Sequence, residues 1–202
     1  MMMASMPARI KGATILSTIS LVREACPPQK YQELVANCPS ETQQLMRRTL
    51  VALEWLPADV WAPFLVVLLN QLCRRDEGKL RRLMRGVFQR DFTTTYRASL
   101  AGITAEGLLT KLSTLWPLLF DGGSLRAQAL GSSGTILIEL REFPTVSTIY
   151  AIVCEAYVEQ LFAMVTSGKV EIRRLREQLS NGLLSCEYTL TYERPATAGP
   201  TP

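Results

Sequence analysis

The residues best suited to bind a charged partner form a cationic segment before the middle of the chain. Between positions 74 and 90, seven basic residues stand against only two acids, Asp76 and Glu77. Apolar residues recur at helical spacing in the same segment, so most of the cations should lie on the exposed side of one helix. Such a face can bind phosphates, an acidic protein or an anionic membrane surface, or it can be a solvated face with internal ion pairs. The candidate residues for an anionic partner are Arg74, Arg75, Lys79, Arg81, Arg82 and Arg85.

Two carboxylates, Glu155 and Glu159, lie one helical turn apart inside a long apolar stretch. At this spacing both side chains share one face of a helix, where a carboxylate pair can do acid–base chemistry or bind a cation. No histidine accompanies them, and Arg141 or Arg173 is the expected partner in a structural ion pair. The ion pair is the simpler interpretation, so we expect no catalytic residues here.

The chain contains no histidine. This removes the commonest general base, the commonest metal ligand and the usual proximal ligand of haem. Five cysteines are scattered without a CxxC pair, a pattern typical of reduced thiols in a cytoplasm. We therefore expect a protein that is not an enzyme and has no metal or other cofactor, and haem held by a proximal histidine is excluded.

The stretch 145–168 should form one long helix at the centre of the fold. Apolar residues occupy nearly every face of it, which is typical of a helix that is covered on most sides. Glu155 and Glu159 argue against a membrane span, because each would cost roughly 2.5–3.5 kcal/mol in lipid. We expect this helix in the core and close to a homodimer interface. The candidate core and dimer residues are Ile149, Ile152, Val153, Tyr157 and Phe162.

The remaining pattern divides the chain into two parts that share one core. Helical spacing dominates 9–120, although Ile10 could begin a short strand, and alternation in 121–192 indicates two hairpins around the central helix. Asn181-Gly182 should be the turn of the second hairpin. The sequence thus predicts an α+β fold, with the helical N-terminal half packed against a four-stranded antiparallel sheet (β-β-α-β-β) in the C-terminal half. We expect a flexible lead (1–8), a single domain (9–192) and a disordered proline-rich tail (193–202).

Large aromatic residues offer a second candidate site. With a few polar groups, such rings can line a cavity for a hydrophobic ligand, and they can equally be ordinary core packing. The candidate pocket residues are Trp55, Trp61, Phe64, Trp116 and Phe120.

A set of short motifs runs through most of the chain: Lys11-Gly12, Trp55-x-Pro57, Leu115-Trp116, Phe120-Asp121-Gly122-Gly123, Phe143-Pro144, Gly182, Cys186 and Tyr188. Together they resemble an uncharacterised family of paralogous myxobacterial proteins. That family is similar in layout to 4-vinyl reductase domains, haem nitric-oxide/oxygen-binding domains and TRAPP transport-particle subunits. The resemblance implies an α/β fold, frequent dimerisation and, in some relatives, an apolar pocket for haem, acyl chains or other hydrophobic ligands.

Two departures from these relatives limit what the resemblance implies. The proximal histidine of the haem-binding relatives is missing. The second hairpin keeps Cys186 but lacks the other cysteine often found there in 4-vinyl reductase-like domains. A two-cysteine metal or redox site is therefore not expected.

The function that these observations favour is binding. The net charge of +4 is modest, and we expect neither a signal peptide nor a membrane span, because the N-terminal residues lack an apolar stretch after their positive charges and no apolar run reaches 18 residues. We expect a cytoplasmic bacterial module with a regulatory or scaffolding role that acts by protein–protein interaction, with itself or with another protein. The alternative is a sensor for a small hydrophobic ligand such as a lipid or a tetrapyrrole. Nucleic-acid binding through the basic helix 74–90 is less favoured, since no aromatic residues alternate with its charges.

Overall fold

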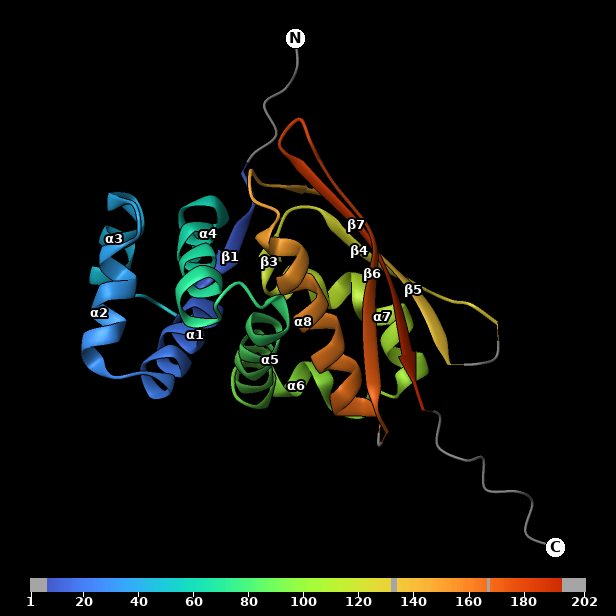
Figure 1. Ribbon diagram of the computed structural model, residues 1–202. Helices are drawn as coiled ribbons and strands as arrows, with labels where there is room; N and C mark the ends of the chain where they lie inside the picture. The colour runs from blue at the N-terminus through green and yellow to red at the C-terminus, as the bar shows by residue number, and fades with distance from the viewer. Residues whose placement is uncertain (1–6, 132–133, 167, 194–202) are drawn as a thin grey trace, which may run out of the picture.

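The computed structural model describes residues 7–131, 134–166 and 168–193. It has the predicted α+β fold, with most helices in the first half and the larger sheet in the second (Figure 1). The helices are α1 (Gly12–Ala25), α2 (Pro28–Ala36), α3 (Ser40–Arg47), α4 (Ala58–Val67), α5 (Glu77–Thr93), α6 (Arg97–Leu100), α7 (Ala105–Leu115) and α8 (Ile149–Val165), with a π-helical turn (Leu68–Leu72) and a 3-10 turn (Trp116–Leu118). The strands are β1 (Arg9–Lys11), β2 (Trp55–Pro57), β3 (Phe120–Asp121), β4 (Ser124–Ala129), β5 (Thr135–Pro144), β6 (Val170–Ser180) and β7 (Leu183–Tyr192). The expected disordered tail lies outside the described residues, apart from Glu193.

The larger sheet is four-stranded and antiparallel, in the order β4-β5-β7-β6. Helix α8 follows β5 in the chain, which gives the β-β-α-β-β order that the sequence predicts. The second hairpin turns at Asn181-Gly182, whose φ angles of +53° and +73° are those of a two-residue hairpin turn. The ladders are irregular between Leu140 and Phe143 and between Arg174 and Arg176. Strand β6 forms one edge of this sheet.

A second, small sheet joins the start of the chain to the end of the helical part. Strand β1 pairs with both β2 and β3, so that Ile10 lies opposite Leu56 on one side and Phe120 on the other. Ala8 is already buried, and its N–H donates to the carbonyl of Pro144 at 3.2 Å. Packing thus begins one residue before the expected boundary at 9, and most of the expected lead lies outside the described residues.

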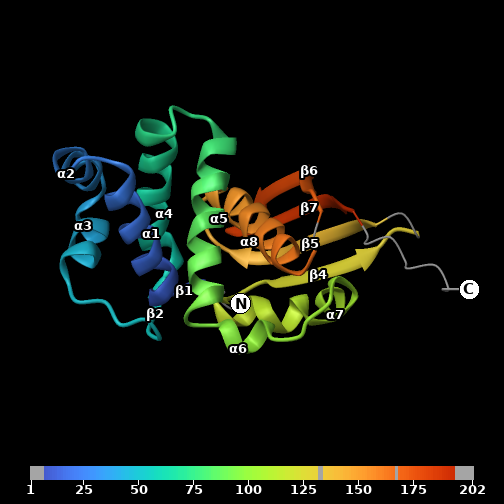
Figure 2. The same ribbon diagram turned by 90° about the horizontal axis from the view of Figure 1, so that it is seen from below.

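Helix α8 lies between α5 and the larger sheet (Figures 1 and 2). It spans Ile149–Val165 rather than the expected 145–168. It starts later because Thr145 Oγ1 and the Val146 N–H donate to the Asp59 carboxylate, at 2.6 and 3.2 Å. It ends before Gly168 because the backbone is already extended at Thr166.

Helix α8 lies in the core, as the sequence predicts, whereas its expected place near a dimer interface stays a prediction. The candidate residues Ile149, Ile152, Val153, Tyr157 and Phe162 are all buried within one chain. They belong to an unbroken buried run from Ile149 to Phe162, and α8 is packed against α4, α5, α7, β6 and β7 of the same chain. This run offers no surface to a second subunit. The homodimer stays a prediction that needs another surface.

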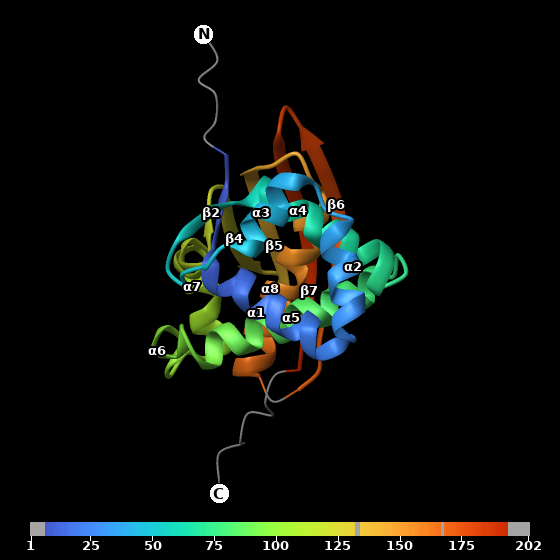
Figure 3. The ribbon, with the colours of Figure 1, turned by 90° about the vertical axis from the view of Figure 1, so that its left-hand side faces the viewer.

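The helical part shares its core with the sheet part. Helix α5 packs against α1 on one side and α8 on the other. The rings of Phe88 on α5 and Tyr157 on α8 meet edge to face, with centroids 5.4 Å apart. Viewed from the helical end, α2, α3 and α4 lie in front and the sheet lies behind them (Figure 3). Over the described ranges, no helix is both long and apolar enough to cross a membrane.

Candidate functional site between α5, α8 and β6

The two carboxylates of the central helix face arginines from two other elements. The Glu155 and Glu159 side chains are only 6% and 9% exposed, and a buried charge is tolerated only when it is paired. Glu155 Oε1 accepts from Arg174 Nε on β6 at 2.6 Å. Glu159 Oε1 accepts from Arg85 Nη1 on α5 at 2.8 Å. The Glu159–Arg85 pair connects the helical part of the chain to the sheet part, whereas the Glu155–Arg174 pair joins α8 to the edge strand.

The partners differ from those that the sequence suggested. Arg141 pairs with Glu139 on its own strand at 2.6 Å. Arg173 is exposed, whereas its neighbour Arg174 is turned inward to Glu155. Alternation along β6 explains this difference, because successive side chains of a strand point to opposite faces.

Arg81 lies between the two carboxylates and satisfies neither of them well. Its side chain is 32% exposed, and its contacts are Nη1 to Glu155 Oε2 at 3.4 Å, Nε to Glu159 Oε2 at 3.4 Å and Nη1 to the Ile172 carbonyl at 3.5 Å. Charge-assisted hydrogen bonds are normally about 2.7–2.9 Å long. Glu159 Oε2, although close enough to Arg81 to count as an ion pair, has no hydrogen-bond partner among the described residues. The donor capacity of the half-exposed Arg81 is therefore left unused, whereas Glu159 Oε2 is enclosed by the protein.

The basic segment does not form one continuous exposed face. Arg81 and Arg85 are half-buried against α8, which corrects their expected place on the exposed side of the helix. Arg90 pairs with Glu24 at 3.0 Å. The remaining candidates are exposed: Arg74, Arg75, Lys79 and Arg82.

An open hollow of about 720 Å³ lies beside this network, where α5 and α8 meet the edge strand β6. We call it the α5–β6 groove. Its charged and hydroxyl-bearing lining includes Arg81, Arg85, Glu159, Lys169, Arg173 and Thr189. A smaller hollow of about 380 Å³ continues along β6 and shares Arg81, Ile172 and Arg173 with it.

The aromatic candidates fall into separate places. The rings of Trp116 and Phe120 stack with centroids 4.2 Å apart, and those of Trp61 and Phe64 meet at 4.9 Å. These four side chains are at most 1% exposed. Trp55 is half-buried, with Lys11 Nζ 3.7 Å from its ring centroid. None of the five lines the α5–β6 groove or the smaller hollow beside it.

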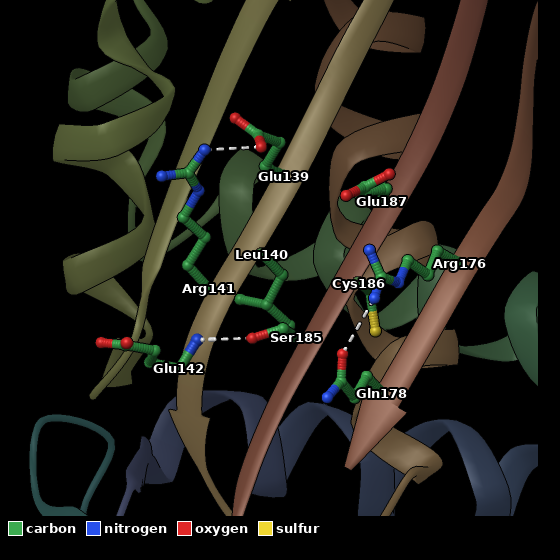
Figure 4. A pocket seen from close by; sticks show the side chains of 9 residues that line it. All are labelled: Glu139, Leu140, Arg141, Glu142, Arg176, Gln178, Ser185, Cys186 and Glu187. Atoms are coloured by element: carbon green, nitrogen blue, oxygen red, sulfur yellow. Dashed lines mark hydrogen bonds and ion pairs between the residues drawn. The ribbon is translucent and has the colours of Figure 1, made fainter. Parts of the chain in front are cut away.

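A third hollow, of about 280 Å³, lies on the larger sheet (Figure 4). Its charged side chains alternate with buried residues along β5 and β7, so they lie on the face turned away from the core. Figure 4 shows Arg141 directed at Glu139 and Arg176 directed at Gln178, at 2.6 and 3.2 Å. This hollow is smaller than the α5–β6 groove, and both of its arginines have close hydrogen-bond partners. The α5–β6 groove is therefore the better candidate site.

One buried carboxylate escaped the sequence reasoning. Asp91 on α5 is 1% exposed and accepts from Thr14 Oγ1 at 2.9 Å and Ser17 Oγ at 2.5 Å. Burial raises its pKa to about 6, although both hydroxyls oppose the shift. The sequence does indicate that Asp91 is buried, because Asp91 continues the apolar stripe of Met84 and Val87 at helical spacing.

No protein-family model and no curated protein sequence matches the chain. Solved structures of the same fold are H-NOX domains. They include a substituted Tt H-NOX protein (13% identity, TM-score 0.65), an oxygen-binding H-NOX domain related to soluble guanylate cyclases (11%, 0.60), and a protein solved to study haem redox potential under porphyrin distortion (12%, 0.63). Each alignment covers 92% of this chain and 96% of the other. The chain therefore shares its fold with haem nitric-oxide/oxygen-binding domains, one of the expected groups of relatives.

The residues of this chain do not fit haem as histidine-ligated proteins hold it, because the chain has no histidine. Burial raises the pKa of the Cys38 and Cys186 thiols to about 11, and that of Cys154 well above its ordinary value. In the core beside α8, the chain's own rings of Trp116, in the 3-10 turn, and Tyr157, on α8, pack 5.4 Å apart, centroid to centroid. The sharing of a fold does not bring the cofactor with it.

Proposed function

We propose that this chain is a ligand-binding sensor module that works without histidine-ligated haem. The observation that carries the proposal is the half-buried Arg81 guanidinium, which makes no ion-pair or hydrogen-bond contact shorter than 3.4 Å to the described residues and borders a groove of about 720 Å³. The H-NOX-like fold supports it, because the neighbours include an oxygen-binding domain. We propose further that the chain is not an enzyme and that it acts in the cytoplasm.

The groove is a suitable place for a signal to begin. Arg81 and Arg85 belong to α5, whereas their partners Glu155 and Glu159 belong to α8, which packs on the sheet. A ligand that engages these arginines changes their pairing with α8 and therefore the contact between the two parts. A ligand shifts such an equilibrium only by its difference in affinity for the two arrangements.

A thermal-unfolding screen of the purified protein against small molecules tests the proposal. A ligand at about 100 times its Kd stabilises the native state by about 2.7 kcal/mol, which corresponds to a rise in Tm of roughly 5–10 °C for a chain of this size. Haem added in the same assay should give no axially ligated Soret spectrum. Stoichiometric haem binding, or a screen in which no compound shifts Tm, would contradict the proposal.

A hydrophobic ligand remains the alternative within the same class. Native mass spectrometry of the purified protein separates the two cases. A copurified lipid or tetrapyrrole of fixed stoichiometry would show that the ligand is hydrophobic and would favour an apolar site over the polar groove. Protein without added mass is expected if the groove takes a small polar ligand that is lost in purification.

A protein-interaction role is the second candidate function, and the edge strand β6 favours it. Leu175 and Leu179 on this strand are 54% and 38% exposed, and an unpaired edge can receive a strand from another protein. Analytical ultracentrifugation at micromolar concentration tests the homodimer. A monomer there would leave only a different protein as the partner on this edge.

A further inference from the structure

A further hollow, of about 470 Å³, lies between α1, α2 and α3, and we call it the α1–α3 hollow. Figure 1 shows α2 and α3 at the end of the molecule away from the larger sheet, with α1 beside them. The volume is within the range of small-molecule sites, about 300–1,000 Å³. Three lining residues on each of α2 and α3 follow at positions i, i+3 and i+4, so one face of each helix turns toward the hollow. These residues are Gln32, Val35 and Ala36 on α2, and Gln43, Met46 and Arg47 on α3.

The hollow offers apolar surface in a frame that the fold already holds. Tyr31 is 9% exposed, and Val35 and Met46 are half-buried, so the lining contains apolar side chains that are partly withdrawn from water. Gln43 ties α3 to the end of α2, because its Nε2 donates to the Cys38 carbonyl at 2.8 Å. The shape of the hollow is therefore set before a ligand arrives.

Two arginines in the lining are held against other lining residues of the same hollow. Arg23 lies over the Tyr31 ring, with its Cζ 4.7 Å from the ring centroid. Arg47 Nη2 donates to Gln43 Oε1 at 3.2 Å. A guanidinium has five N–H donors, so these contacts leave donors for a ligand. Both side chains belong to exposed residues, which makes them accessible from solvent.

The positive charge of this hollow is not balanced by carboxylates. Among the described residues, its lining includes no acid, and neither lining arginine forms an ion pair. Nearby acids are paired elsewhere: Glu24 with Arg90 at 3.0 Å, and Glu33 with Lys30 at 3.1 Å. A negatively charged ligand therefore meets attraction here without a competing carboxylate in the lining.

We propose that the α1–α3 hollow binds an amphipathic anion, a carboxylate or phosphate joined to a short apolar chain or ring. Arg23 and Arg47 attract and hold the anionic group, and Tyr31, Val35 and Met46 cover the apolar part. The hollow and the α5–β6 groove have no lining residue in common. The inference therefore concerns a second site and goes beyond the proposed function.

Three probes separate the contributions of the charge and of the apolar chain. Octanoate has both, acetate keeps the carboxylate without the chain, and 1-octanol keeps the chain without the charge. Octanoate should bind at least tenfold tighter than either of the others, because its two parts meet different groups of the lining. Octyl phosphate in place of octanoate then identifies the preferred anionic group.

Methionine-methyl NMR of the full chain measures the affinity and the place of binding in one titration. The methyl signal of Met46, identified with Met46→Leu, should move and saturate as octanoate is added. Met84 on α5 and Met164 on α8 lie outside the lining of the hollow, so their signals should stay in place. A shift at Met164 without one at Met46 would overturn the inference.

Two substitutions test the charge, and a third is the control. Arg23→Gln and Arg47→Gln should each weaken octanoate about three- to tenfold, and both residues are exposed, so the fold should tolerate the change. Arg48→Gln is the matched control, because Arg48 is the exposed neighbour of Arg47, pairs with Glu54 at 2.8 Å and does not line the hollow. It should change the affinity less than about twofold.

The outcomes distinguish this inference from the proposed function. Saturable octanoate binding at Met46 that weakens in Arg23→Gln and Arg47→Gln supports the inference, whether or not the thermal screen finds a ligand for the α5–β6 groove. No preference for octanoate over 1-octanol, or a loss in Arg48→Gln as large as in Arg47→Gln, overturns it. A chain that binds neither octanoate nor octyl phosphate also overturns it and leaves the sensor function, which rests on the α5–β6 groove, standing.

Discussion

Replacing Asp91 with asparagine should change how stability depends on pH. Asp91 is buried between α5 and α1 and accepts hydrogen bonds from Thr14 and Ser17. An asparagine keeps the size of the side chain, and the hydroxyls can reorient to its oxygen and nitrogen. Only the ionisation is lost, so the variant isolates the titration of one carboxyl group.

The sign and size follow from the pKa. Burial raises the pKa of Asp91 from 3.8 to about 6, so the folded state holds the proton more tightly than the unfolded state. Stability from this group is complete below the unfolded pKa and is lost as pH rises through about 6. The full loss is about 3 kcal/mol at 1.36 kcal/mol per unit, of which about 2 kcal/mol falls between pH 4 and pH 7.5.

Urea unfolding of both proteins at pH 4 and pH 7.5 measures this effect. Other carboxyl groups titrate in the same range, so the informative quantity is the difference in unfolding free energy between Asp91→Asn and wild type. This difference should shift by about 2 kcal/mol in favour of the variant on going to pH 7.5. A difference that stays constant with pH would refute the claim that Asp91 is buried with a raised pKa.

Three further substitutions test the packing. Gly12→Ala should lower Tm by several degrees or prevent folding, because the added Cβ would lie 2.1 Å from the Val51 carbonyl oxygen; an unchanged Tm would contradict this backbone contact. Trp116→Ala should cost about 3–5 kcal/mol in urea unfolding, since the ring stacks on Phe120, and a loss below about 1 kcal/mol would show a loose core. Glu155→Gln should cost about 3 kcal/mol, almost independently of salt because the carboxylate is buried, and a salt-sensitive loss would place the ion pair at the surface.

Sequence periodicity and turn motifs predicted the helices and turns that are determined by residues close together in the chain. The Asn181-Gly182 turn formed as expected because both residues tolerate positive φ. The central helix was found, but its first turn was not placed, because the carboxylate of Asp59, distant in the sequence, holds Thr145 outside the helix. The small sheet was missed except at Ile10, since β1 pairs with strands far along the chain.

The candidate site was only half predictable, although its signal was in the sequence. Spacing on one helix does not show whether a residue beside the apolar stripe meets water or a neighbouring helix. Arg81 and Arg85 are one turn apart, and so are Glu155 and Glu159 on α8. Two carboxylates on an otherwise apolar helix need cations nearby, and a search for cations at the same spacing on another helix would have predicted that these two arginines point inward.

The H-NOX-like fold and the absence of histidine lead to one conclusion about where a ligand can bind. In this chain the core beside α8 is filled by stacked and edge-on rings, including Trp116, Phe120 and Tyr157. A ligand there would have to displace side chains that are at most 1% exposed, at a cost comparable with a large core substitution of about 3–5 kcal/mol. At the α5–β6 groove, by contrast, the half-buried Arg81 makes no ion-pair or hydrogen-bond contact shorter than 3.4 Å to the described residues. The groove that we propose as the binding site lies at the edge of the α5–α8 contact, where a ligand can act on the pairing of the two parts without opening the core.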